Sequence, residues 1–308
     1  MKAQPLVSVV VPTYGHAALV EETLASIFAQ EYPAVEVIVV DDGSPDDTAE
    51  RLAPLAERGR IRLLRQENRG QAAARNRGLS EARGELVAFL DDDDLWPPDK
   101  LSWQVPLLDD PTVAMVYGDY VKLMPDGSER SLGHARKPQG RVHRQFRRRN
   151  WLLSPGQALM RTAAVRRCGS FDETIWGSDD WDLYIRLATV GEFRWEPRTA
   201  LRYRVHAGAA SRDALRHVRN HLSVVRRHIG WNLPLLIQHQ RLAAGYFVPN
   251  LQRYARERRQ AGDEANARRA ELYALAFRPE LLAKSGYLRS LAAEIRRLRV
   301  RSATTPGA

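Results

Sequence analysis

The sequence predicts an α/β fold, in which a mostly parallel central sheet is flanked by helices and followed by a helical C-terminal region. Apolar runs of strand length occur at 7–11, 35–40 and 85–90, and the segment between the first two has the apolar spacing of a helix. A strand, a helix and a strand in this order are typical of a βαβ unit. Residues 1–206 hold 28 Lys and Arg against 30 Asp and Glu, whereas residues 207–308 hold 19 against 7. We therefore expect an α/β domain over 1–206 and a basic helical region over 207–308.

The composition is that of an ordinary soluble globular protein, with 44% hydrophobic and 27% charged residues in a chain of 308. Cys168 is the single cysteine, so no internal disulfide can form, and a reducing compartment is expected. The first apolar run is broken at Pro12 and is too short for a secretory signal or a membrane span, which predicts a cytoplasmic protein. Because the net charge of +10 comes from the tail, no nucleic-acid partner is expected for the first domain.

The elements before the predicted strand 85–90 follow from local patterns. The β-branched run 7–11 predicts a buried strand, and 35–40 and 61–64 predict two more. The helix between the first two strands has one apolar face, formed by Leu19, Val20, Leu24, Ile27 and Phe28. Small residues between 68 and 78 predict a helix that packs closely on the sheet. Arg75 of this helix could reach a phosphate or a base, or lie in solvent.

Two of the predicted strands end in carboxylates. The run 35–40 is followed by Asp41 and Asp42, where an α/β sheet places the base or ribose of a nucleotide. The alternative is a simple Asp-Gly turn in which Ser44 or Asp46 caps the next helix.

Four consecutive carboxylates, Asp91 to Asp94, follow the strand 85–90, and no Lys or Arg lies among them. Like charges beside an apolar strand are costly without a cation, and oxygen ligands favour Mg²⁺ or Mn²⁺. The sequence therefore predicts a metal site here. The alternative is a solvated loop in which Asp94 caps the next helix.

Past the carboxylates the signals are weaker. Prolines at 97 and 98 precede a new helix, and 113–117 and 120–124 predict the two strands of a hairpin, with 125–127 as a turn. The basic segment 134–149 lacks periodicity and is predicted to be a mobile loop over a cleft.

Four segments of the chain form a combined pattern. They are Val-Ser-Val-Val-Val-Pro-Thr-Tyr at 7–14, Val-Asp-Asp-Gly-Ser at 40–44, Asn-Arg-Gly followed by Ala-Arg-Asn-Arg-Gly within 68–78, and Phe-Leu-Asp-Asp-Asp-Asp at 89–94. In order and spacing they resemble the family 2 glycosyltransferases of the GT-A fold, and the resemblance covers roughly 5–206. It implies transfer of a sugar from a nucleotide-diphosphate sugar with inversion at the anomeric carbon.

The resemblance assigns a nucleotide site at the start of the chain. Pro12, Thr13 and Tyr14 match the loop that touches the base, and Asp42 matches the carboxylate that reads the base, which is usually uracil. One departure is visible, because the Asn that often follows the Tyr is Gly15 here. This departure leaves the local geometry of the loop open.

The resemblance also assigns the metal site. Asp91 and Asp93 match the outer residues of an Asp-any-Asp motif, with Asp93 as the direct metal ligand and Asp91 as a ligand that also lies near the ribose. Asp92 and Arg75 join the predicted nucleotide site. His206 falls where related enzymes often place a residue near the diphosphate or metal, although a lone His is commonly structural. Mn²⁺ or Mg²⁺ is the implied cofactor.

A second acidic group is needed, because the nucleophile must lose a proton. The segment 176–187 resembles the acidic pair of the family at the start of a helix, and alignment on Arg186 places Asp180 on the general base. The helix dipole would keep such an Asp ionised. The alternative is that Asp179 or Asp180 only caps the helix. The acceptor side is assigned weakly to Trp151, Trp176, Asp179 and Trp181.

From Ser211 onward the sequence predicts basic helices. One apolar face is formed by Leu215, Val218, Leu222 and Val225. A second, near the end, is formed by Tyr287, Leu288, Leu291, Ile295 and Leu298. Such helices could contact an anionic membrane surface, pair with a second subunit or pack on the first domain. Residues 302–308 are predicted to be disordered.

The sequence thus predicts a metal-assisted inverting glycosyltransferase, with a uridine-linked donor and a hydroxyl acceptor on a glycan or lipid-linked glycan. We place it in the cytoplasm, with peripheral contact to the inner face of the membrane as an option. One alternative is a sugar-phosphate nucleotidyltransferase, which would need a Gly-rich basic loop where 12–16 stands. The other is a nucleic-acid-binding protein that uses the tail, although the tail lacks a recognisable module.

Overall fold

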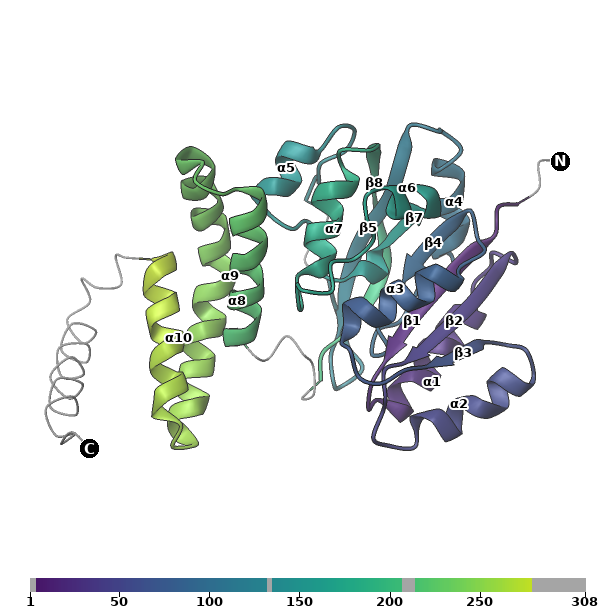
Figure 1. The fold of residues 1–308 in the computed structure, drawn as a ribbon, viewed down its shortest axis with the longest axis horizontal. Coiled ribbons are helices and arrows are strands. Elements are labelled where there is room, and N and C mark those ends of the chain that lie inside the picture. Colours follow the sequence, from purple (N-terminus) through teal and green to yellow (C-terminus); the bar gives the residue numbers. More distant parts are fainter. Residues whose placement is uncertain (1–3, 132–134, 207–213, 279–308) are drawn as a thin grey trace, which may run out of the picture. The chain divides into compact units, whose positions relative to one another are not determined.

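The computed structural model describes residues 4–131, 135–206 and 214–278. These residues form two compact units (Figure 1). The first contains the described residues of 1–210 together with 220–231, and the second contains those of 211–219 and 232–308. The division between the units runs through helix α8 (Ala214–His228).

The first unit is built on an eight-stranded sheet with the order β3-β2-β1-β4-β7-β5-β6, and β8 pairs with β5. Its strands are β1 (Val7–Thr13), β2 (Val35–Asp41), β3 (Arg62–Arg65), β4 (Leu86–Phe89), β5 (Val113–Leu123), β6 (Glu129–Ser131), β7 (Ala158–Arg161) and β8 (Glu192–Arg204). The pairings among β1 to β4 and between β5 and β8 are parallel, whereas β7 is antiparallel to both β4 and β5. The predicted α/β fold is confirmed, with a mixed sheet.

Helices cover both faces of this sheet. They are α1 (Ala17–Phe28), α2 (Thr48–Glu57), α3 (Gln71–Glu81), α4 (Lys100–Leu107), α5 (His143–Arg148), α6 (Thr162–Arg167) and α7 (Asp179–Leu187), with a 3₁₀ turn at Pro155–Gln157. The apolar face of α1 packs in the same core as Val9 and Val11. Helix α3 packs on the opposite face, where a Cβ at Gly78 would lie 2.3 Å from Cγ1 of Val10. The predicted close packing of the small-residue helix is therefore confirmed.

The predicted hairpin at 113–124 is wrong, because 113–123 forms the single strand β5. The strand continues through Gly118 and Asp119 by shifting its register against β8 on either side of Asp119. The predicted turn at 125–127 exists, but it joins β5 to β6. Gly127 lies there at φ +79°, a backbone conformation that favours glycine.

The predicted loop at 134–149 is also partly wrong, because its second half forms α5. Phe146 of α5 is fully buried and makes edge-to-face contacts with Tyr117, Tyr184 and Phe193. These aromatic contacts come from distant parts of the chain, so local periodicity did not indicate the helix. Residue 134 lies outside the described residues.

The second unit is helical. It consists of the first part of α8, α9 (Leu233–Gln260) and α10 (Glu264–Phe277), and the rings of Phe247 and Phe277 stack at 5.1 Å in its core. Of the predicted α8 face, Leu222 is wrong, since it is 40% exposed and Val224 is buried instead. The predicted face at 287–298 and the predicted disorder at 302–308 lie outside the described residues. None of the described helices has the length and apolar content that crossing a membrane requires.

Candidate active site

A group of potential metal ligands lies where β1 and β4 end. Asp92 and Asp93 follow β4, and His16 follows β1. Nδ1 of His16 lies 3.0 Å from Oδ1 of Asp92. Within the described residues, His16, Asp92 and Asp93 each offer one ligand atom, and these atoms all lie within 4.8 Å of one another. Two carboxylates and one imidazole are ligands that could hold a divalent cation.

His206 lies beside the same group, just past the end of β8. Its Nε2 is 2.9 Å from Oδ2 of Asp93, and its ring meets that of His16 edge to face at 5.9 Å. The hydrogen bond to Asp92 raises the pKa of His16, and burial works against this effect. Two imidazoles thus face two adjacent carboxylates, and the role of His206 as a ligand stays a prediction.

Asp91 points to a different set of partners. Its Oδ1 accepts hydrogen bonds from Arg75 Nη2 at 2.6 Å and Gln71 Nε2 at 2.9 Å, and its Oδ2 accepts one from Ser154 Oγ at 3.2 Å. Arg75 is buried, and its Nη1 also donates to Oδ2 of Asp179 at 2.6 Å. The alternative of a solvated Arg75 is therefore wrong. A single guanidinium links the strand carrying the carboxylates to the helix carrying the second acidic group.

Asp94 is buried and takes a structural position. Its Oδ1 accepts a hydrogen bond from the backbone N–H of Arg204 at 3.0 Å. Burial, with the neighbouring carboxylates Asp93 and Asp91 adding to it, raises the pKa of Asp94 well above its ordinary value. Helix α4 begins only at Lys100, so the alternative of Asp94 as a helix cap is wrong.

Asp180 lies in the first turn of α7, immediately after Asp179. Its Oδ1 accepts the backbone N–H of Trp181 at 2.7 Å, and its Oδ2 accepts Asn150 Nδ2 at 3.3 Å. Burial and the Asp179 carboxylate raise the pKa of Asp180 to about 7, against the opposing effect of Arg75. Ser178 holds the N-cap position, so neither Asp is the cap residue itself. The carboxylate of Asp180 can therefore exchange a proton near neutral pH.

Asp42, the predicted base reader, organises the loop that leads into α3. Its Oδ1 accepts Gln66 Nε2 at 2.8 Å and the N–H of Arg69 at 2.9 Å, and its Oδ2 accepts the N–H of Gly70 at 2.8 Å. A Cβ at Gly70 would lie 2.5 Å from Nε1 of Trp176, so this glycine permits a close approach of the indole. The buried carboxylate of Asp42 thus fixes the backbone of the loop that leads into α3. Its contact with a nucleotide base stays a prediction.

The alternative for this region, a cap by Ser44 or Asp46, is also answered by the structure. Helix α2 begins at Thr48 with Asp47 at its N-cap. Ser44 Oγ accepts the N–H of Gly15 at 3.0 Å, so Ser44 does not cap the helix. Oδ1 of Asp46 accepts the N–H of Thr48, the first residue of α2, at 3.2 Å, and its Oδ2 accepts the N–H of Ala17 at 3.3 Å. Asp46 therefore binds the start of α2, as the alternative expected, and also the loop after β1.

The predicted nucleotide loop follows directly from β1. Pro12 and the buried Thr13 end the strand, and Tyr14 is 46% exposed. The N–H of Tyr14 donates to Oδ2 of Asp92 at 3.3 Å, which connects this loop to the carboxylates. Gly15 has φ +70°, a conformation that glycine and asparagine adopt more readily than other residues. This explains why a glycine can replace the asparagine that often occupies the position.

The predicted acceptor residues separate into two groups. Trp181 is 1% exposed, donates from Nε1 to the carbonyl of Phe146 and stacks on His221 at 4.8 Å, so it is a core residue and not an acceptor contact. The carboxylate of Asp179 is likewise buried against Arg75. Trp176 is 36% exposed and Trp151 is partly buried, and their contact with an acceptor stays a prediction.

Sequence reasoning did not identify the contribution of 220–231. Asp182 of α7 is fully buried, and its Oδ1 lies 2.7 Å from Nε2 of His228 and 3.2 Å from Nη1 of Arg227. Its Oδ2 accepts Nη2 of Arg186 at 2.7 Å. The second part of α8 therefore holds the helix that carries Asp180.

The sequence also gave no indication of His16 and Asn150 as site residues, because single residues in loops give no periodic signal.

Comparisons with known proteins identify the family of this chain. The model of the family described as "Glycosyl transferase family 2" matches residues 8–174. An uncharacterised glycosyltransferase of Rickettsia prowazekii is 30% identical over 219 residues, which cover 68% of this chain and 67% of the relative. A relative from Rickettsia felis is 29% identical over 223 residues, but these make up only 36% of its length.

A putative teichuronic acid biosynthesis glycosyltransferase of Bacillus subtilis, TuaG, is 39% identical over 128 residues, or 41% of this chain and 50% of that protein.

Two solved structures share the fold. TarS 1–349 of S. aureus in complex with UDP-GlcNAc has a TM-score of 0.58 at 19% identity, over 86% of this chain and 90% of that one. The mannosyltransferase PcManGT from Pyrobaculum calidifontis, with GDP-Man and Mn²⁺, has a TM-score of 0.56 at 24% identity, over 89% and 88%. Since the family model covers more than half of the chain, this protein belongs to glycosyl transferase family 2.

Proposed function

We propose that this glycosyltransferase transfers a sugar from a nucleotide-diphosphate sugar to a hydroxyl group of a glycan or lipid-linked glycan, with inversion at the anomeric carbon. The observation that carries the proposal is the position of Arg75, which lies 2.6 Å from both Asp91 and Asp179. Through it, the carboxylates after β4 and the acidic start of α7 form one site. Sugar transfer requires the residues that bind the donor and the residues that activate the acceptor to lie close together.

The donor half of the proposal rests on His16, Asp92 and Asp93. These residues would hold the cation, with His206 beside them, and Mn²⁺ suits an imidazole-containing set better than Mg²⁺. When bound, such a cation neutralises the negative charge that develops on the departing diphosphate. The related structures were solved with UDP-GlcNAc and with GDP-Man and Mn²⁺, which supports a nucleotide-sugar donor. Of the two bases in these donors, uracil and guanine, we expect uracil in the donor of this protein.

The acceptor half rests on Asp180. Its carboxylate takes the proton of the acceptor hydroxyl while that oxygen attacks the anomeric carbon from the face opposite the diphosphate. One carbon–oxygen bond forms, and the bond to the diphosphate breaks with its electron pair going to the leaving oxygen. Asn150 and the N–H of Trp181 hold the carboxylate during this step. A single displacement of this kind gives inversion at the anomeric carbon. We propose that the reaction takes place in the cytoplasm.

A calorimetric titration tests the donor half. The protein is titrated with UDP, GDP and TDP, each in Mn²⁺ and in EDTA, and the Asp93→Ala variant is measured beside it. We expect UDP to bind in Mn²⁺ and to lose its binding in EDTA and in the variant. Asp126→Asn is the matched control, because Asp126 lies in the exposed turn before β6. Absence of nucleotide binding under both conditions would remove the proposal.

A separate measurement tests inversion. Once a donor is identified, proton NMR of the product reports the anomeric configuration of the transferred sugar. A product with the configuration of the donor would contradict the single displacement while leaving nucleotide-sugar transfer intact.

A further inference from the structure

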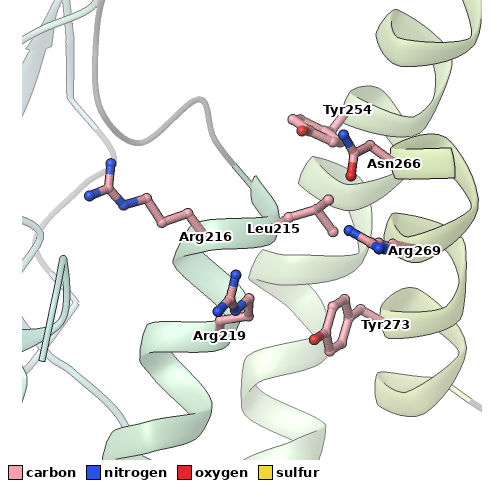
Figure 2. A pocket seen from close by; sticks show the side chains of 7 residues that line it. All are labelled: Leu215, Arg216, Arg219, Tyr254, Asn266, Arg269 and Tyr273. Atoms are coloured by element: carbon pink, nitrogen blue, oxygen red, sulfur yellow. The ribbon is translucent and has the colours of Figure 1, made fainter. Parts of the chain in front are cut away.

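The helical unit and the first unit each contain a group of arginines away from the potential metal ligands. In the helical unit, arginines line a pocket of about 500 Å³ among α8, α9 and α10 (Figure 2). Asp263 accepts a hydrogen bond from Asn266 of this lining at 2.8 Å, and that contact, with the charge of Arg269 adding to it, lowers the pKa of Asp263. The pocket therefore has a counter-charge within its own unit.

The arginines of the first unit lie in α5 and the residues that flank it. Residues 141–149 contain five arginines and no carboxylate. Arg141 lies 3.7 Å from Glu192, and Arg147 donates to the carbonyl of His228. The exposed Arg149 lies over the ring of Trp151, with the carbon of its guanidinium 4.5 Å from the ring centroid.

The stacked guanidinium of Arg149 is suited to bind an anion. Stacking uses its flat face, whereas its N–H donors lie in the guanidinium plane and can still bind a carboxylate or a phosphate in pairs. Nε1 of Trp151 donates to the carbonyl of Gln145 at 3.3 Å, which fixes the indole against the preceding helix. Trp151 therefore reduces the side-chain freedom that Arg149 would lose on binding.

The same loop contacts both halves of the proposed active site. Arg149 and Trp151 lie on either side of Asn150, whose Nδ2 donates to Oδ2 of Asp180 at 3.3 Å. Successive Cα atoms are about 3.8 Å apart, so both side chains lie within reach of a sugar whose hydroxyl contacts Asp180. Farther along the loop, Ser154 donates to Asp91 at 3.2 Å.

The surroundings of Tyr120 place Arg149 at the same edge of the sheet. Burial raises the pKa of Tyr120, and the charge of Arg149 opposes this rise, so the guanidinium lies near the phenol. Tyr120 pairs with Leu201 of β8, and the next residue of β8, Arg202, forms a bridge with Leu95, directly after the four carboxylates. Arg149 therefore lies on the side of the sheet where sugar transfer is proposed.

We propose that Arg149, positioned by Trp151, binds an anionic group of the acceptor, so that the enzyme selects acceptor sugars that carry a phosphate or a carboxylate. This inference rests on the proposed function, in which Asp180 accepts the proton of the acceptor hydroxyl. The guanidinium holds the charged group while the hydroxyl lies at Asp180, which orients the acceptor at two points. A neutral sugar lacks the second contact.

Three glycosides that differ in one group test the proposal. Methyl glucoside is neutral, methyl glucuronide carries a carboxylate at C6, and methyl glucoside 6-phosphate carries a phosphate there. Their dissociation constants for the full chain are measured by ligand-observed NMR in EDTA, so that no cation binds the phosphate. We expect a charged glycoside to bind about tenfold more tightly than the neutral one, and the tighter of the two charged compounds identifies the anionic group.

Variants test the two residues separately. Arg149→Gln should bring the three dissociation constants to within about twofold of one another, because an amide carries no charge. Trp151→Ala should weaken the preference for the charged compounds, whereas Trp151→Phe should keep it, since a phenyl ring also stacks with a cation. Arg60→Gln is the matched control, because Arg60 is an exposed arginine over the ring of Phe28 at 4.3 Å and precedes β3, at the opposite edge of the sheet.

UDP binding in Mn²⁺ is measured beside these titrations. A wild type that binds no UDP would remove the proposed transfer, whereas equal affinity for the three glycosides overturns only the preference for anionic acceptors. An equal change in Arg60→Gln and Arg149→Gln would also overturn it, because the effect would then be diffuse charge attraction. A fall in UDP affinity in Arg149→Gln would place the guanidinium on the donor diphosphate and contradict the proposal.

Discussion

The four consecutive carboxylates show how neighbouring residues of one type acquire different roles. Asp91 is neutralised by Arg75, Asp92 and Asp93 face His16 and His206, and Asp94 has a pKa raised well above its ordinary value by burial. The repulsion among the four carboxylates, which the sequence predicts, is therefore relieved in three separate ways. The proposed cation would therefore face two carboxylates rather than four.

Prediction at this scale succeeded where a residue follows a strand or starts a helix, and failed where a partner comes from far along the chain. The sequence indicated the carboxylates after β4 and the acidic start of α7, because both follow from local pattern and spacing. It did not indicate that Asp91 and Asp93 point to different partners, since Arg75 and His206 approach from separate elements. Burial of Trp181 depends on Phe146 and His221, which are equally distant in sequence.

Asp180→Asn should lower kcat/KM by about 10²–10⁴-fold, because an amide cannot accept the proton of the acceptor hydroxyl. In the wild type, kcat/KM should rise with pH and level off above the pKa of Asp180, which is about 7. Initial rates across this range check both statements. A pH profile that is flat through neutrality would contradict the assignment of Asp180 as the base.

The same substitution should stabilise the folded protein at high pH. The pKa of Asp180 is raised by folding, so this group favours the folded state at low pH, and that contribution is lost as pH rises through about 7. Asp180→Asn does not ionise and should therefore unfold a few degrees above the wild type at alkaline pH, with the difference shrinking toward acid pH. Thermal unfolding followed by circular dichroism measures it, and Asp126→Asn serves as the exposed control.

At the scale of elements, local periodicity predicted the parallel half of the sheet and missed much of the rest. β1, β2 and β4 are mainly apolar, whereas β8 (Glu192–Arg204) contains several charged residues and buries only Phe193, Ala200 and Leu201. Its position is fixed by pairing with β5, about eighty residues earlier in the chain. Such pairings depend on tertiary context, which a local pattern does not contain.

Gly78→Ala should destabilise the first unit by about 1–3 kcal/mol, because its Cβ would meet Cγ1 of Val10 at 2.3 Å and overpack the interface of α3 with the sheet. Gly245→Ala, in an exposed part of α9 with no heavy atom within 4 Å of the new Cβ, should instead stabilise by about 0.5–1 kcal/mol. Urea denaturation of both variants provides the comparison. Equal shifts in one direction would contradict the packing argument.

The contacts between α7 and the second part of α8 lead to another prediction. Asp182→Ala leaves His228 and Arg186 without their buried acceptor, so we expect a loss of about 3–5 kcal/mol in the free energy of unfolding. Arg226→Ala, an exposed neighbour on α8, should change it by less than about 0.5 kcal/mol. Denaturant unfolding measures both variants. A near-neutral Asp182→Ala would show that α8 does not support α7.

At the scale of the whole molecule, the boundary predicted at 206 separates residues that the structure keeps together. The change of charge after residue 206 indicated a new region, but 220–231 belongs to the first compact unit. Val224, Val225 and Ile229 are buried in this segment, and His228 contacts Asp182. Composition indicates where the charge of a chain changes, but it does not indicate where a compact unit ends.

The two boundaries predict different behaviour for shortened chains. A chain of residues 1–231 should unfold cooperatively and keep metal-dependent nucleotide binding, because it retains the whole of the first unit. A chain of residues 1–206 exposes the surface that 220–231 covers and leaves Asp182 without His228, so its unfolding midpoint should fall and its affinity for UDP with it. Denaturant unfolding and calorimetry on the two chains make the test. Equal stability and affinity would show that the glycosyltransferase unit ends at 206 after all, and that the contacts of α8 with α7 contribute nothing to the site.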